Sequence, residues 1–159
     1  MSPLHTLFRW LGHTTIGVAM ARSTWGFPLI EMAHLIGLAG LGGTILIVDL
    51  LLLGFGPGRL SPSHVARELR PLFVASLTVM MVSGVLLVSA EALKCYYNPA
   101  FRAKMALLFL AIAISYAIHR NLSRPGADDR PTVWLKTAAI LSLILWLCVG
   151  AAGRLIGLV

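Results

Sequence analysis

The sequence predicts an all-α integral membrane protein: a four-helix bundle with an N-terminal amphipathic helix at the membrane interface. Hydrophobic residues make up 58% of the 159 residues and charged residues 12%, against about a half and a quarter in soluble domains. The mean hydropathy is +0.86. Four stretches are long and apolar enough to cross the hydrocarbon core, which takes about 20 helical residues. Because a one-domain chain of this composition cannot bury its apolar surface in water, we expect lipid to cover much of it.

The four stretches make residues 1–159 a single transmembrane domain. We expect spans at about 26–54, 71–93, 99–119 and 133–157. After the first span, GPGRLSPSHVAREL predicts a turn and a short polar helix that Ser61 or Ser63 could cap. After the second span, KCYYNP places two tyrosines at the level of the lipid headgroups.

Residues 3–22 have a different pattern, typical of a helix lying in the membrane interface. Their apolar residues recur at helical spacing, and most of the basic residues and histidines fall off that stripe. The stripe consists of Leu4, Leu7, Phe8, Leu11 and Val18, and the polar positions are His5, Arg9 and His13. A helix packed against the protein's own spans would give the same pattern, so both arrangements stay open.

The charge distribution favours a lipid partner and gives a weak prediction of the orientation in the membrane. The net charge of +7 comes from basic residues that flank the spans, where they meet anionic headgroups. No basic stretch lies free of the spans, which argues against nucleic-acid binding. Of the 13 Lys and Arg residues, seven flank the first and third connections and six lie on the opposite face. This bias predicts a bacterial inner membrane protein with both termini in the periplasm.

The two cysteines and the N-terminal residues carry limited information. Cys95 and Cys148 have no spacing for a metal site, and they could form a disulfide only if both lay at the same membrane face. His5, Arg9 and His13 interrupt the first segment, so we expect no cleavable signal peptide.

Ionisable residues inside spans are rare and usually functional. The sequence places six of them there: Glu31, His34, Asp49, Glu91, Lys104 and His119. Within EMAHLIGLAGLGG, Glu31 lies one turn before His34 and could orient its imidazole through a hydrogen bond. Gly37 lies one turn after it and could leave a flat slot for a porphyrin. These glycines could equally serve close helix packing.

Lys104 opens the third span at a depth similar to that of His34. Neutral, it could be an axial heme ligand; charged, it could pair with a heme propionate, with Glu31 or with Glu91. Snorkelling to the headgroups is the simpler alternative. His13 on the same face is a second candidate partner for His34.

His119 closes the third span, 15 positions after Lys104, or about 22 Å of helix rise. The two therefore cannot bind one small ion together. A histidine at a helix C-terminus can simply complement the helix dipole. Its functional alternative is a second metal or heme site with His64 or Asp49.

A family resemblance covers nearly the whole chain. The stretches EMAHLIGLAGLGGTILIVDLLLLG and AEALKCYYNPAFRAKMALLFLAIAISYAIHR resemble an uncharacterised bacterial family of small four-span membrane proteins. This resemblance implies the architecture and brings no activity with it.

A more distant resemblance implies a cofactor. A histidine before a Gly-rich turn, then a span with an early Lys and a late Tyr and His, is similar to the HemJ-type protoporphyrinogen oxidase and to CopD-like membrane proteins. The HemJ resemblance implies that His34 and Lys104 hold heme b, with Tyr116 and His119 matching the end of the motif. The first span continues as TILIVDLLLLG and lacks the aromatic and arginine pattern of HemJ, which favours the heme slot over the oxidase activity.

These observations lead to three hypotheses for the function. The first is a membrane b-type heme protein that transfers electrons to or from quinone or a partner redox subunit. The second is a cofactor-free assembly subunit or a copper-handling protein, since histidines suit copper; its candidate ligands are His34, His119, His13 and His64. The third is a HemJ-like porphyrinogen oxidase. A homo-oligomer or a larger redox complex is expected for so small a chain.

Overall fold

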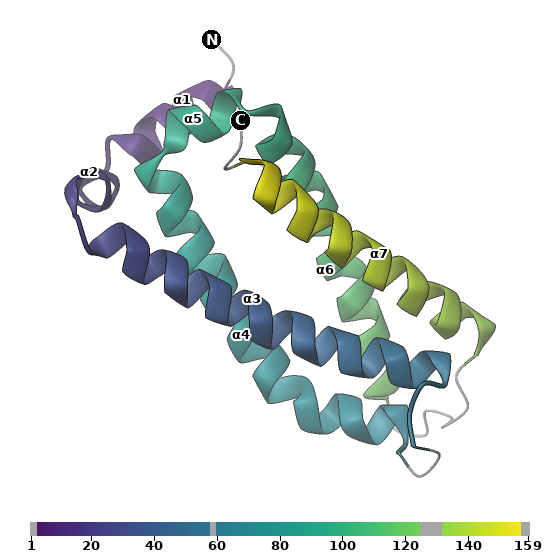
Figure 1. Cartoon of the computed structure of the whole chain (residues 1–159). Helices are drawn as coiled ribbons and strands as arrows, with labels where there is room; N and C mark the ends of the chain where they lie inside the picture. The colour runs from purple at the N-terminus through teal and green to yellow at the C-terminus, as the bar shows by residue number, and fades with distance from the viewer. Residues whose placement is uncertain (1–2, 58–59, 125–131, 157–159) are drawn as a thin grey trace.

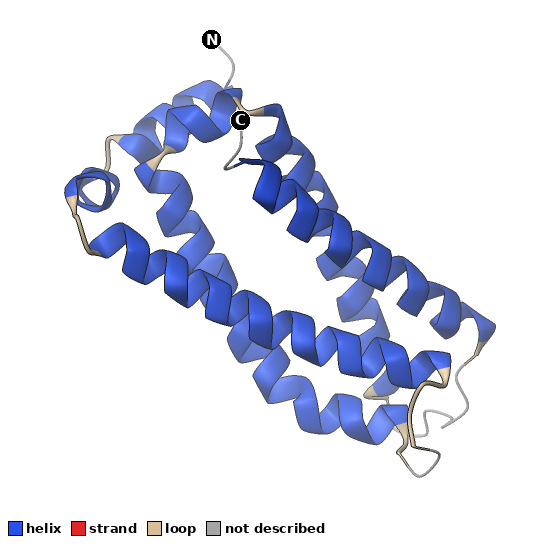
Figure 2. Ribbon diagram, viewed as in Figure 1, coloured by secondary structure: helices blue, strands red, loops and turns tan. Residues whose placement is uncertain are grey.

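The computed structural model describes residues 3–57, 60–124 and 132–156. Four of its helices are long and apolar enough to cross a membrane: α3 (Gly26–Leu53), α4 (Pro62–Ala90), α6 (Pro99–Leu122) and α7 (Val133–Ile156). They pack together, and the described residues contain no β-strand (Figure 1, Figure 2). The predicted all-helical, four-span architecture is therefore confirmed, and the chain is a multi-pass membrane protein.

Local capping sets the ends of these helices. α3 ends at Gly54, whose φ of 91° is a left-handed conformation that places its N–H on the last carbonyls of the helix. α6 begins after Asn98, whose side-chain oxygen accepts backbone hydrogen bonds from Ala100 at 2.9 Å and Phe101 at 3.3 Å. The predicted starts at 26, 99 and 133 agree with the structure, and α6 runs three residues past the predicted end at 119.

The second span is longer than the apolar stretch that predicts it. Ser61 caps the helix as expected, accepting a hydrogen bond from the backbone N–H of His64 at 3.4 Å. The polar segment and the span then form one continuous helix, α4, with Pro71 inside it. Proline removes one backbone hydrogen bond from a helix, and here packing within the bundle holds the helix continuous across that gap.

The four spans form two pairs. α3 packs along α4 and α6 along α7, and contacts of α3 with α7 join the pairs. The pairs lie close where α3 and α6 end, here named the loop end, and separate toward the opposite end, named the cap end (Figure 1). Because the spans are even in number, α1 and the last turn of α7 both lie at the cap end (Figure 1).

The fully buried core fills the middle of the bundle and the loop end. The middle cluster consists of Leu41, Ile45, Phe73, Met80, Leu108, Ala111, Leu145 and Val149. The loop-end cluster consists of Val48, Leu52, Ala66, Ile118, Leu122, Ala138 and Ala139. Toward the cap end, the core-facing stripe of α3 continues from Leu41 through Gly37 and Leu38 to His34, seven residues before Leu41.

Three short helices cover the cap end: α1 (Pro3–Gly12), α2 (Thr15–Arg22) and α5 (Ala92–Tyr97). The single helix predicted over 3–22 is wrong in this detail. Thr14 breaks it and caps α2, accepting a hydrogen bond from Gly17 N at 3.2 Å. The break turns α2 against α4, so that a Cβ at Gly17 would lie 2.8 Å from the Ser89 carbonyl oxygen.

The KCYYNP segment, expected to place its tyrosines at the level of the lipid headgroups, contributes to α5, which packs against α1. The rings of Phe8 and Tyr96 lie 5.6 Å apart, and those of Phe8 and Phe101 lie 6.2 Å apart. The opposite side of α1 exposes Trp10, as an interfacial helix would. The segment therefore packs on the protein and keeps an exposed apolar side, and its position in the membrane interface stays a prediction.

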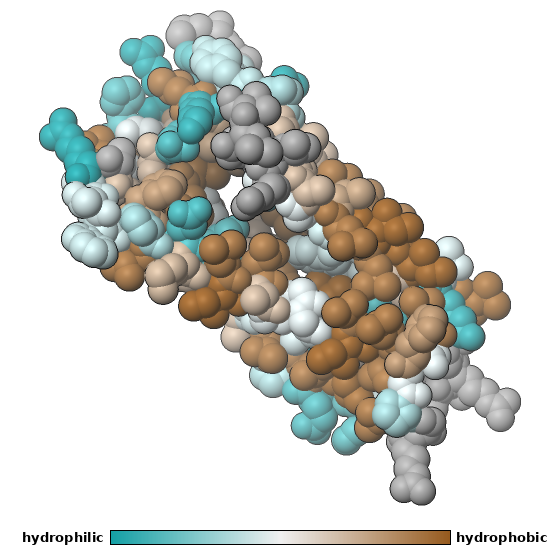
Figure 3. Space-filling view, viewed as in Figure 1, coloured by the Kyte–Doolittle hydropathy of each residue, from teal (hydrophilic) through white to brown (hydrophobic). Residues whose placement is uncertain are grey.

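Large apolar side chains cover the outside of the spans. Among the most exposed are Ile36, Val82, Phe109 and Leu147. In the space-filling view this apolar surface lies over α3 and α7, and polar residues gather at the two ends (Figure 3). This distribution matches a hydrocarbon belt between two headgroup layers. Of the basic residues counted to predict the orientation, Arg59, Arg130 and the side chain of Arg154 lie outside the described residues. Position 157, the predicted end of the fourth span, also lies outside them.

Candidate functional site

His34 is held on the inner side of α3 by a hydrogen bond to α4. Its Nδ1 lies 2.9 Å from the Ser83 hydroxyl oxygen. The same hydroxyl donates to the Val79 carbonyl at 2.6 Å. A serine has one hydroxyl proton, so a Ser83 hydroxyl that donates to Val79 accepts from the imidazole, and this arrangement corresponds to the tautomer with its proton on Nδ1. In that tautomer Nε2 carries the lone pair, which is how ligating histidines are oriented.

Gly84 makes room for this imidazole. A Cβ at position 84 would lie 3.3 Å from His34 Cε1 and 3.7 Å from Nδ1. An added Cβ would therefore require the ring to move by a few tenths of an ångström, and a large side chain would displace it further. Gly37, predicted to leave a slot next to His34, faces the α4 backbone instead. A Cβ at that position would lie 3.0 Å from Met80 N and 3.2 Å from the Ser76 carbonyl oxygen, so Gly37 serves helix packing.

Lys104 enters the same end of the bundle from α6. It is half-buried and lies on the helix stripe that also carries Leu108 and Ala111. A Cβ at Gly153 of α7 would lie 3.4 Å from its Nζ, so this glycine makes room for the ammonium group. Lys104 and His34 interact electrostatically. The structure thus brings together the two residues that the HemJ resemblance singles out.

Five residues therefore form what we name the cap-end site: His34, Ser83, Gly84, Lys104 and Gly153. They come from all four spans, at the end where the two helix pairs separate (Figure 1). Figure 3 shows the surface hollowed between α3 and α7 at this end. Glu31, the predicted orienting residue, is exposed and interacts with His34 only electrostatically. Ser83 makes the orienting hydrogen bond in its place.

The remaining predicted ligands lie elsewhere. Tyr116 is 58% exposed on the outer side of α6. His13 is exposed between α1 and α2, and His64 is exposed near the start of α4 at the loop end. Within the described ranges, no three His, Cys, Asp or Glu side chains lie close enough to hold a metal ion. The set of four histidines considered for copper is therefore dispersed over both ends of the bundle.

His119 is buried at the loop end, with 7% of its surface exposed. Neither ring nitrogen has a hydrogen-bond partner. Its ring lies against Phe73, with centroids 4.4 Å apart and planes inclined by 32°. The described neighbours of His119 thus pack against its ring and leave its nitrogens unused.

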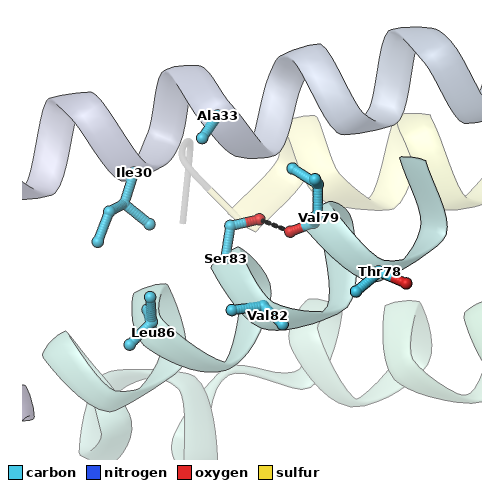
Figure 4. A pocket seen from close by; sticks show the side chains of 7 residues that line it. All are labelled: Ile30, Ala33, Thr78, Val79, Val82, Ser83 and Leu86. Carbon is cyan, nitrogen blue, oxygen red and sulfur yellow. Dashed lines mark hydrogen bonds between the residues drawn. The ribbon is translucent and has the colours of Figure 1, made fainter. Parts of the chain in front are cut away.

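An apolar groove lies on the outer side of the α3–α4 pair, behind the His34–Ser83 bond. It has a volume of about 300 Å³ and is open to the outside. Figure 4 shows Ile30 and Ala33 of α3 facing a wall of α4 residues that includes Val82 and Ser83. Ser83 therefore lies between the groove and the imidazole.

Cys95 lies in α5, one of the short helices that cover the cap end, and interacts electrostatically with Lys104. Burial raises the pKa of its thiol, and the nearby Glu91 carboxylate raises it further. Glu91 itself pairs with Lys94 at 3.4 Å, with both side chains largely exposed. Cys95 and Cys148 are both free thiols.

Sequence reasoning missed Ser83 and Gly84. Their signal is the Ser–Gly pair in VMMVSGVLLV, a hydroxyl and a missing side chain inside an apolar run. In membrane helices such positions mark contacts with another helix, and here the contact is with His34.

Comparisons with curated proteins and with solved structures gave no match. A comparison with family models gave one, described as a family of unknown function, DUF6644, over residues 6–159. The match includes most of α1, all of α2, all four spans and every residue of the cap-end site. The chain therefore belongs to the DUF6644 family, whose function is unknown.

Proposed function

We propose that this protein is a membrane b-type heme protein that transfers electrons in the bacterial inner membrane. The observation that carries the proposal is the His34–Ser83 hydrogen bond of 2.9 Å, which engages Nδ1 and in the Nδ1–H tautomer makes Nε2 the ligand atom. When bound, heme b supplies reversible one-electron chemistry, and its axial ligands and apolar surroundings set the potential.

The residues of the cap-end site fit a heme in their donor chemistry. A neutral imidazole with its other nitrogen hydrogen-bonded is the usual protein ligand of heme iron. Lys104 is a cation at the same level of the bundle, and its ammonium group suits a propionate carboxylate. Unprotonated, the same nitrogen would be a second ligand of the iron. Lys104 is therefore proposed either as a propionate partner or as an iron ligand.

The backbone at the site accommodates both polar side chains. Gly84 and Gly153 let the imidazole and the ammonium group lie close against α4 and α7. The two helix pairs separate at this end (Figure 1), and the two buried hydrophobic clusters occupy the middle and the loop end. His34 and Lys104 are the residues that would hold a heme at this end of the bundle.

The electron partner that we propose is a quinone or a partner redox subunit. The groove behind Ser83 supports the quinone, because it opens to the hydrocarbon layer and is lined almost wholly by apolar side chains. A lipid-soluble molecule in this groove would be separated from the imidazole by the Ser83 side chain.

The test is the heme content of the full-length protein, purified in detergent after expression with ample heme. We expect a pyridine hemochrome of type b in the wild type and its loss in His34→Ala. His64→Ala is the matched control, because His64 is an exposed histidine at the other end of the molecule. A wild type without heme, or equal heme content in all three proteins, would rule out the proposal.

A further inference from the structure

A second polar group lies at the loop end, and the proposed heme site does not use it. Asp49 of α3 is 2% exposed, and its carboxyl lies close enough to the Ser142 hydroxyl of α7 to interact with it. The Ser142 hydroxyl lies 3.4 Å from the Ser115 hydroxyl of α6. Ser115 in turn accepts a hydrogen bond from the Trp146 indole N–H at 3.0 Å. Three spans thus contribute to one buried chain of hydrogen bonds that ends on a carboxyl group.

Asp49 has no cation to balance a negative charge. Its Oδ2 has no hydrogen-bond partner, and none of the described cations forms an ion pair with it. The other ionisable side chains at this end of α4, α6 and α7 are exposed, namely His64, Arg67, Glu68, Arg70, Arg120 and Lys136. The exception is His119, which is buried against Phe73 with both nitrogens unpaired. A carboxylate isolated in an apolar interior is costly and becomes neutral by taking up a proton.

We propose that Asp49 is a proton-binding site in the core of the membrane domain, joined to Ser142 and Ser115 by a reversible hydrogen-bond chain. Hydroxyl groups both donate and accept. When Asp49 is ionised, Ser142 donates to the carboxylate; when Asp49 is protonated, the carboxyl donates to Ser142 and the hydroxyl turns. A lysine or arginine in place of Ser142 would lock Asp49 in its charged form.

The surroundings of Asp49 favour a proton over a metal ion. Hard cations such as Ca²⁺ and Mg²⁺ take about six or more oxygen ligands. The chain offers one carboxyl group and two hydroxyls, and one of those hydroxyls already accepts from Trp146. The loop-end cluster around it is apolar and includes Val48, Ala138 and Ala139. A proton needs one oxygen atom and no cavity.

The test is infrared spectroscopy of the full-length protein in lipid vesicles, over a range of pH. The wild type should show the C=O stretching band of a protonated carboxyl at neutral pH, shifted in D₂O. Asp49→Asn should lose this band, and Asp49→Glu should move it. Glu91→Gln is the control, because Glu91 is an exposed carboxylate paired with Lys94, and it should leave the band unchanged.

Ser142→Ala tests the chain without removing the carboxyl. Loss of the hydrogen bond should move the C=O band to higher frequency, while Ser142→Thr, which keeps the hydroxyl, should leave it near its original position. Identical spectra for the wild type and Asp49→Asn would overturn the proposal. So would a wild-type band that disappears at constant pH when Na⁺ is added, because the site would then bind a metal cation.

Discussion

The two ends of the bundle bury their polar groups in different ways. At the cap end, His34 and Lys104 are half-buried, and each lies against a glycine of a neighbouring span, Gly84 or Gly153. At the loop end, Asp49 and His119 are 2% and 7% exposed, within close apolar packing. Partial burial leaves a polar side chain accessible to a large ligand, whereas full burial in close packing suits a proton.

The contrast extends to hydrogen bonding. One ring nitrogen of His34, Nδ1, is hydrogen-bonded to Ser83. His119 has both nitrogens unpaired, against Phe73. A buried polar group without a partner costs about 1–3 kcal/mol. We therefore expect replacement of His34 and replacement of His119 to have different effects on the protein.

The largest effect is expected from Gly84→Leu. The new side chain would start 3.3 Å from His34 Cε1 and displace the imidazole, so we expect the loss of bound heme. Gly150→Leu is the control, because Gly150 is exposed on α7 and a Cβ there meets nothing within 4 Å. Heme content and size-exclusion profiles of both variants give the answer. Full heme content in a folded Gly84→Leu protein would place the heme elsewhere.

A smaller effect is expected from Ser83→Ala. The imidazole would lose the hydrogen bond that fixes its tautomer, and loss of such a supporting contact lowers metal affinity about 10- to 100-fold. Heme titration and the midpoint potential measure the change, and the potential should shift as well. Ser83→Thr keeps the hydroxyl and should restore both values toward the wild type. A variant with unchanged potential and affinity would contradict the orienting role.

The smallest effect is expected from His119→Phe. The substitution removes two unpaired buried nitrogens and keeps an aromatic ring against Phe73. Since an unpaired buried group costs about 1–3 kcal/mol, thermal unfolding in detergent should occur at the wild-type temperature or above it. Heme content should not change. A strong loss of stability or of heme would show that His119 has a partner or a ligand in the membrane.

The spans could be predicted from the sequence because their length and apolar composition follow from the bilayer itself. Position 26, where Trp25 precedes a long apolar run, and position 99, with its Asn–Pro cap, begin helices as predicted. The start of α4 could not be placed, because Pro71 and the polar residues before it look like a boundary. Packing within the bundle keeps the helix continuous there.

The sequence could predict only those features of the site that lie on a single helix, and not the contacts between helices. His34 and Lys104 stand out because ionisable residues in apolar runs are rare. Helical spacing alone points to Glu31, one turn away, as the orienting group, whereas the structure uses Ser83, which is 49 positions away along the chain. The role of Gly37 was undecided between a slot and packing for the same reason. Only the placement of α4 against α3 settles both points.

The most direct test of the proposed heme site is chemical rescue of His34→Gly, followed by its reduced-minus-oxidised visible spectrum. The substitution removes the imidazole and leaves a gap that free imidazole can fill. The account predicts a b-type spectrum in the wild type, its loss in His34→Gly, and its return when imidazole is added. A colourless wild type expressed with ample heme, or a His34→Gly protein that keeps the wild-type spectrum without imidazole, would contradict it.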